Sequence, residues 1–174
     1  MKPPIIITGA HRSGTSATAH ALLDMGLFLG AHRMPRHDEA FFFFRIQNDY
    51  LKSVGATWSQ PQPFLDHIAT PEGHAHCRTY LEQHVKGPRG FTLPFYHKFG
   101  GWRYGAMMAL GRDIPWGWKD PRTTLFMPVW MDLFPEAKVL HIVRHPLDIA
   151  LSLQSREMRK RSHRGGRPSD HFQS

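Results

Sequence analysis

The sequence predicts an α/β fold in three layers, with a central parallel sheet flanked by helices. Its first unit is an apolar run over residues 5–8, a glycine-containing turn over residues 9–14 and a helix-like stretch over residues 15–27. Strand-like and helix-like segments alternate again after Pro115. Alternation of this kind is typical of a parallel sheet that is covered by helices on both faces.

The first predicted helix, residues 15–27, has the pattern of a helix packed on a sheet. Apolar side chains recur on one face at spacings of three to four residues, at Ala19, Leu22, Leu23 and Leu27. Glycine is common just after helix ends, so Gly26 or Gly30 is expected to end this helix.

The remaining elements fall into two groups. Between residues 28 and 117 the chain is rich in proline, glycine and aromatic residues, and helices are predicted only near residues 38–54 and over residues 71–86. The last part predicts a strand over residues 116–119, a helix over residues 122–134, a strand over residues 138–143 and a helix opened by Pro146.

The length of 174 residues allows one domain. We expect that domain to cover residues 1–158 and a basic, flexible tail to cover residues 159–174. The formal net charge of +8, with 13 histidines besides, favours an anionic partner. Nucleic acid, an anionic membrane, a phosphorylated nucleotide and an acidic sugar all carry the required charge.

The N-terminal segment and the cysteine content bear on the compartment. Cys77 is the only cysteine, which excludes an intramolecular disulfide and favours a reducing compartment. The apolar run at residues 5–7 is too short for a secretion signal or a membrane span. We therefore expect a cytoplasmic protein with no membrane span.

Three basic loops each follow a predicted strand: residues 9–15, 119–122 and 144–146. The carboxyl ends of parallel strands meet at one edge of the sheet, which is where ligands bind in such folds. We expect the three loops to converge there.

The loop that begins at Gly9 is of the phosphate-cradling type, and makes the fold class P-loop-like. Gly9 and Gly14 match the two glycines of the GxxxxGK[ST] pattern, but Thr15 occupies the position of the lysine that nucleotide kinases need. The cation lies inside the loop, at Arg12. A P-loop-type kinase or NTPase is therefore an alternative and not the first choice.

The segment His11-Arg12-Ser13-Gly14-Thr15-Ser16 resembles the 5′-phosphosulfate loop of the sulfotransferase superfamily, particularly its bacterial and carbohydrate-acting members. The resemblance implies an enzyme that uses 3′-phosphoadenosine 5′-phosphosulfate (PAPS), releases 3′-phosphoadenosine 5′-phosphate (PAP) and needs no metal. It further implies that Arg12 contacts the bridging oxygen and the sulfuryl group. The 5′-phosphate would be held by Ser13, Gly14, Thr15 and Ser16.

Residues 139–152 resemble the 3′-phosphate segment of the same family, an arginine at a strand end followed eight residues later by a serine. The resemblance assigns the 3′-phosphate to Arg144 and Ser152. Their spacing also has a physical sense, because about two helical turns bring the two side chains to opposite sides of one phosphate.

A third motif, residues 118–122, is similar to a Lys-Asp-Pro-Arg stretch of related bacterial sequences. In this interpretation Lys119 contacts the sulfuryl group or the acceptor. Asp120 is equally consistent with a helix N-cap that takes no part in the chemistry.

Transfer to a hydroxyl requires a proton acceptor near the loop. Glu39 is the first candidate, His37 the second and Asp38 the third. Glycosaminoglycan sulfotransferases keep a glutamate and aromatic residues at a similar place, although Phe41 stands here where that family has histidine. The alternative is that the two carboxylates only charge the first turn of a helix.

The expected partners follow from these motifs: a small-molecule or carbohydrate acceptor with a hydroxyl or amine, and no nucleic acid. His74, His76 and Cys77 match no common zinc spacing, so no metal site is expected. A catalytically silent module that binds a nucleotide or a polyanion remains the second alternative. The sequence indicates no oligomeric state.

Overall fold

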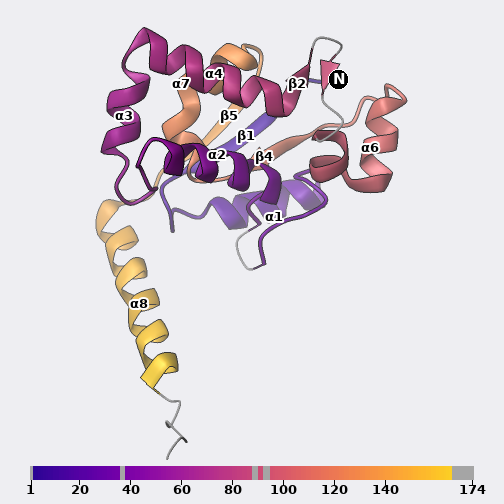
Figure 1. The fold of residues 1–174 in the computed structure, drawn as a ribbon. Helices are drawn as coiled ribbons and strands as arrows, with labels where there is room; N and C mark the ends of the chain where they lie inside the picture. The colour runs from indigo at the N-terminus through magenta and orange to yellow at the C-terminus, as the bar shows by residue number, and fades with distance from the viewer. Residues whose placement is uncertain (1, 36–37, 88–89, 92–94, 166–174) are drawn as a thin grey trace, which may run out of the picture.

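The structure is a computed structural model that describes residues 2–35, 38–87, 90–91 and 95–165 (Figure 1). Three parallel strands form the central sheet in the order β4, β1, β5. They are β1 (Ile5–Gly9), β4 (Gly117–Lys119) and β5 (Lys138–Ile142). The predicted α/β class with a parallel sheet flanked by helices is confirmed.

Strand β1 lies in the middle of the sheet and contributes to a core on each face. Because successive side chains of a strand point to opposite faces, the side chains of Ile6 and Ile7 lie on different faces of the sheet. Ile7 joins a small core with Ala19 of helix α1 (Thr15–Asp24), together with Leu29. Ile6 joins the larger core on the opposite face. Helices therefore cover the sheet on both sides, which gives the three layers.

The larger core is built mainly from aromatic rings. Phe43 of α2 (Phe41–Ser53) stacks on Trp118 of β4, with ring centroids 4.0 Å apart and planes 10° from parallel. Trp130 of α7 (Thr123–Leu133) packs on the same indole at 5.0 Å. All three side chains have no exposed surface. These contacts fix α2 and α7 against the strand that carries Lys119.

Helix α2 begins at Phe41 and not near residue 38 as predicted. Asp38 has φ of 52° and Ala40 is extended, with φ of −62° and ψ of 110°, so the helix cannot start before them. Helix α1 likewise ends at Asp24, before residue 27, because Gly26 turns the chain with φ of 90°. Helix α4 (Pro71–Val85) keeps its predicted range to within one residue.

Several elements of the middle segment were not predicted. They are α3 (Gln62–Ile68), the π-helical turn η1 (Tyr96–Gly100), α6 (Gly101–Ala109) and the antiparallel pair β2 (Lys86–Gly87) and β3 (Gly90–Phe91). Their prolines and glycines were interpreted as loop signals. At a helix start, however, a proline such as Pro61 loses no hydrogen bond.

Helix α8 (Pro146–Gly165) follows edge strand β5 and projects away from the body of the domain (Figure 1). It continues past residue 158, so residues 159–165 are helical, and the domain boundary at residue 158 stays a prediction. Arginine and lysine are good helix formers, and no glycine interrupts them before Gly165. Residues 166–174 lie outside the described part of the chain. Within that part, no helix has the length and apolar character needed to cross a membrane.

Removal of the Phe43 ring should be one of the costlier changes in the core. We expect Phe43→Ala to lower the free energy of unfolding by about 3–5 kcal/mol, because a buried aromatic side chain leaves a cavity. The matched control is Phe41→Ala in the same helix, where the ring is 44% exposed. That change should cost less than about 1 kcal/mol. If urea denaturation shows that the two variants lose equal free energies of unfolding, the stacking role of Phe43 is contradicted.

Candidate active site

The carboxyl ends of the three strands surround a cavity of about 420 Å³. All three basic loops predicted from the sequence reach it. The predicted residues that line the cavity are Arg12, Gly14, Thr15, Ser16, Glu39, Lys119, Arg144 and Ser152. The expected convergence of the loops on one edge of the sheet is therefore present.

The first loop makes a cradle that starts helix α1 at the cavity. Gly9 has φ of 147°, and a Cβ there would lie 2.4 Å from the carbonyl oxygen of Ile142. Arg12 and Gly14 also have positive φ, at 73° and 106°. Gly14 is the N-cap of α1 and supplies no side-chain cap. A helix start of this kind offers backbone amides and a positive dipole end to an anion.

Ser13 lies within this cradle and is 6% exposed. Its backbone N–H donates to the carbonyl oxygen of Ala10 at 3.1 Å. Its Oγ is buried and has no hydrogen-bond partner among the residues that the structure describes. Buried hydroxyls normally find a partner, and Ser13 is not among the residues that line the cavity.

The first and last motifs of the chain are in direct contact. Arg12 Nε donates to Ser152 Oγ at 2.8 Å, and Arg144 Nη1 donates to the carbonyl oxygen of Arg12 at 3.3 Å. Arg144 also forms an ion pair with Asp148, with 3.5 Å between Nε and Oδ2. Arg12 and Arg144 thus both line the cavity where helix α8 meets the cradle.

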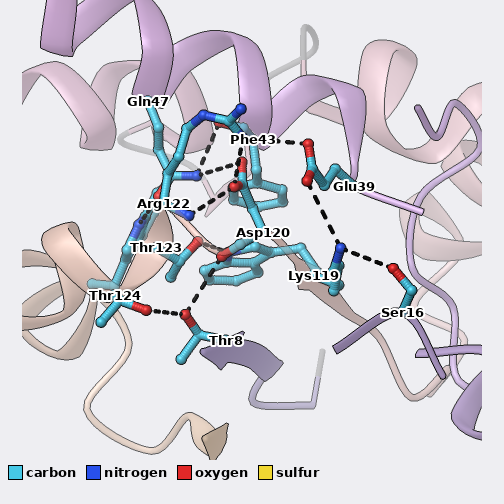
Figure 2. A network of polar contacts seen from close by, with 12 residues as sticks. Thr8, Ser16, Glu39, Phe43, Gln47, Lys119, Asp120, Arg122, Thr123 and Thr124 are labelled. Atoms are coloured by element: carbon cyan, nitrogen blue, oxygen red, sulfur yellow. Dashed lines mark hydrogen bonds and ion pairs between the residues drawn. The ribbon is translucent and has the colours of Figure 1, made fainter. Parts of the chain in front are cut away.

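Glu39, which also lines the cavity, lies between two cations (Figure 2). Its Oε1 is 3.8 Å from Lys119 Nζ, and its Oε2 accepts from Arg122 Nη1 at 3.3 Å. Lys119 Nζ also donates to Ser16 Oγ at 3.3 Å, which connects β4 to the cradle. Burial lowers the pKa of Lys119 from its usual value, while the carboxylates of Glu39 and Asp120 oppose that effect.

Asp120 anchors this arrangement from inside the protein and has no exposed surface. Its Oδ1 accepts from both the backbone N–H and Nη1 of Arg122, each at 2.9 Å. Its Oδ2 accepts from Gln47 Nε2 at 3.2 Å (Figure 2). Gln47 Oε1 in turn accepts from Trp130 Nε1 at 3.1 Å. Burial raises the pKa of Asp120 to about 6, although Arg122 works in the opposite direction. The alternative that Asp120 is only a helix N-cap is wrong, because the N-cap of α7 is Arg122 and that helix has no side-chain cap.

One candidate for the proton acceptor, Asp38, is not brought into the cavity. Asp38 pairs with His20 at 2.8 Å and with Arg33 at 3.4 Å, and is not among the lining residues. His37 lies outside the described residues. Among the described carboxylates, Glu39 is the one that lines the cavity.

Sequence reasoning missed several residues of the site. Arg122 was recognised only as part of a motif, and its Nε is buried without a hydrogen-bond partner in the described part of the chain. Gln47, a fully buried amide on α2, was not considered. Its position among the apolar residues of that helix was the signal that could have found it. Trp58, which lines the cavity beside His11 at a ring distance of 4.5 Å, was noted without a role.

The histidines and the cysteine of α4 were not expected to bind metal. Tyr50 Oη hydrogen-bonds to His67 Nε2 at 2.9 Å and to His76 Nδ1 at 3.1 Å, and Cys77 is buried beside them. In residues 2–35, 38–87, 90–91 and 95–165 there is no group of three or more His, Cys, Asp and Glu that could hold a metal ion.

Comparison with known proteins gives one match. A family model described as "Sulfotransferase family" matches residues 3–170. Searches of the curated proteins and of the solved structures gave no significant match. The matched range includes every residue that lines the cavity.

Asp120 should give the stability of the protein a pH dependence. Since the folded chain binds its proton more tightly than the unfolded chain, this contribution is full below about pH 4 and is lost as the pH rises through about 6. A pKa raised from 3.8 to about 6 corresponds to a contribution on the order of 3 kcal/mol. The unfolding free energy of the wild type minus that of Asp120→Asn should fall by this order between about pH 4 and 7. A difference that stays constant in urea denaturation over this range would contradict the raised pKa.

Proposed function

The chain belongs to the sulfotransferase family, and from this premise we propose that it moves the sulfuryl group of PAPS to a hydroxyl or amine of an acceptor. The acceptor class we propose is a carbohydrate or another small molecule. The observation that carries the proposal is the meeting of Arg12, Arg144 and Ser152 at one cavity, beside a helix start that lacks a side-chain cap. Buried Cys77 is consistent with the reducing, cytoplasmic compartment that we propose for the enzyme.

The donors around the cavity suit a nucleotide with two phosphate-bearing ends. At the cradle, the start of α1 and the buried Oγ of Ser13 would hold the 5′-phosphate, together with Thr15 and Ser16. Arg144 and Ser152 would hold the 3′-phosphate through charge-assisted hydrogen bonds. Their contact with Arg12 supports one continuous nucleotide site.

The reaction we propose is a direct, metal-free displacement at sulfur. PAPS supplies the activated sulfuryl group, whose bond to the 5′-phosphate breaks as the acceptor oxygen or nitrogen bonds to sulfur. Arg12 and Lys119 would stabilise the negative charge on the sulfuryl oxygens and on the leaving phosphate. Their role is electrostatic, since neither needs to move a proton.

Glu39 is the proposed proton acceptor for the acceptor hydroxyl or amine. Lys119 and Arg122 hold its two carboxylate oxygens, and Asp120 holds Arg122 in turn. We assign Asp120 and Gln47 as positioning residues, because neither lines the cavity and both hold Arg122, Asp120 directly and Gln47 through Asp120. His37 stays the second candidate for the proton acceptor.

The nucleotide assignment can be tested without the acceptor, by calorimetric titration with PAP. We expect PAP to bind, and Arg144→Ala to weaken it by about tenfold to a hundredfold, because one charge-assisted phosphate contact is lost. The matched control is Arg112→Ala, an exposed arginine after α6 that lines none of the cavities described here. It should leave the affinity unchanged.

The same titration with ATP and Mg²⁺ examines the kinase alternative. One contact supports that alternative: Lys119 Nζ donates to Ser16 Oγ. Lys119 lies on β4, the strand beside β1 in the sheet, and could there replace the lysine that is missing from the loop. Preference for Mg-ATP over PAP would overturn the sulfotransferase assignment in favour of a kinase. Binding of neither ligand would overturn the nucleotide site itself.

Glu39→Gln should separate turnover from nucleotide binding. The amide keeps the shape of the side chain but accepts no proton, so transfer should fall at least about a hundredfold while the affinity for PAP changes little. The assay is transfer of labelled sulfate from PAPS to a panel of mono- and oligosaccharides. Glu72→Gln, an exposed change on α4, is the control and should behave as the wild type. Full turnover in Glu39→Gln would remove this residue from the mechanism.

A further inference from the structure

Two further hollows share lining residues with the catalytic cavity or with each other. A hollow of about 720 Å³ between α2, the end of α4 and η1 shares Met34 with the catalytic cavity. A third hollow of about 380 Å³ shares His32 and His97 with the second. These shared residues link the lining of the first hollow, at Glu39, to that of the third, at Trp102 of α6.

The second hollow has a basic rim over a partly apolar floor. Its rim includes Arg33, Arg45 and Lys98, and its floor includes Phe41 and Ile46. Its lining also includes three histidines: His32, His84 and His97. The charge and the mixed surface favour a ligand that is anionic and also has apolar faces.

The arginines of this rim are already held in place by carboxylates. Arg33 Nη1 is 3.4 Å from Asp38 Oδ1, and Arg45 Nε is 3.6 Å from Asp49 Oδ2. Lys98 is exposed and has no ion-pair partner in the part of the chain that the structure describes. The positive charge is thus moderate, which suits scattered carboxylates better than the dense phosphates of a nucleic acid.

The third hollow ends at an exposed ring. Trp102 has 90% of its surface exposed although it lines this hollow. Tyr104, on the same helix, is instead stacked on Phe28 with ring centroids 3.5 Å apart. A free indole beside a hollow offers a flat apolar face, with an N–H at its edge, to the face of a sugar ring.

We propose that the three hollows form one acceptor groove and that the acceptor is an acidic oligosaccharide of several linked sugars. The assignment as an acceptor groove rests on the proposed sulfuryl transfer. Each hollow alone lies within or near the range of about 300–1,000 Å³ of ordinary small-molecule sites, so three in series suit a ligand of several units. The reacting hydroxyl would lie at Glu39, the carboxylates along Arg33, Arg45 and Lys98, and the far ring at Trp102.

Met34 is the residue that joins the first two hollows. Its backbone N–H donates to the carbonyl oxygen of Glu39 at 2.8 Å. One backbone hydrogen bond therefore joins the side of the groove to the residue that carries the proposed proton acceptor. An acceptor that contacts Met34 is positioned relative to the carboxylate of Glu39 by this bond.

Binding of defined hexasaccharides to the PAP-saturated protein tests the proposal. The probes are hexasaccharides of hyaluronan and of polygalacturonate, which carry carboxylates, and neutral maltohexaose. We expect at least one acidic probe to bind at least about tenfold more tightly than maltohexaose. The proposal is overturned if neither acidic hexasaccharide binds more tightly than maltohexaose. It is also overturned if an oligonucleotide of the same charge binds more tightly than both acidic hexasaccharides.

Variants then locate the binding. Lys98→Glu should weaken the acidic hexasaccharide about tenfold or more, whereas Lys52→Glu, the same charge change outside all three hollows, should not. Trp102→Ala should weaken the hexasaccharide but not the disaccharide of the same sugar, which is too short to span the groove. If Lys98→Glu and Lys52→Glu lose the same affinity for the acidic hexasaccharide, the proposed groove is overturned.

The affinity for PAP, measured on every variant, separates the two proposals. Normal PAP binding without preference for an acidic sugar removes the groove and leaves the sulfotransferase assignment intact. The opposite outcome is that PAP does not bind while the acidic hexasaccharide binds in a way that depends on Lys98. That outcome removes the sulfotransferase assignment and leaves a carbohydrate-binding groove.

Discussion

The ion-pair network around Arg122 is the interaction on which the geometry of the site depends. A buried carboxylate such as Asp120 is costly unless a cation and further donors satisfy it, and Arg122 and Gln47 do so. The same guanidinium then reaches Glu39 at the cavity. Because these groups come from the loop after β4, from α2 and from the turn before α2, the network restricts how those elements pack. Site geometry and fold are thus fixed by the same contacts.

Local signals explain what the sequence could predict. The strand, cradle and helix at residues 5–24 form from neighbouring residues, and the basic loops at strand ends could be placed by the parallel topology alone. The middle segment could not be predicted in this way, because its helices are defined by aromatic contacts between distant residues, such as Phe43 with Trp118. The left-handed turn at Asp38 also left no clear pattern, since aspartate adopts that conformation only occasionally.

The site shows the same division between local and distant information. Arg12, Lys119 and Arg144 could be named because each belongs to a short motif next to a strand. The roles of Arg122 and Gln47 depend on side chains that meet from three elements, and single-sequence patterns do not contain that information. The acceptor groove belongs to this second kind, since its rim residues come from the turn at residues 32–35, from α2 and from η1. Motifs therefore led to the proposed nucleotide site, whereas the proposed acceptor groove could be recognised only in the tertiary structure.

The hydrogen bond between Arg12 and Ser152 joins residues that are 140 positions apart in the sequence. Strand β1 has the same property, since its partners β4 and β5 both come from the last third of the chain. During synthesis the first strand therefore emerges long before either neighbour, with its apolar residues and strand edges unpaired. Contacts of such high sequence separation slow folding, and unpaired edges favour aggregation. The arrangement that brings the catalytic loops together thus makes the nascent chain dependent on its last-made strands.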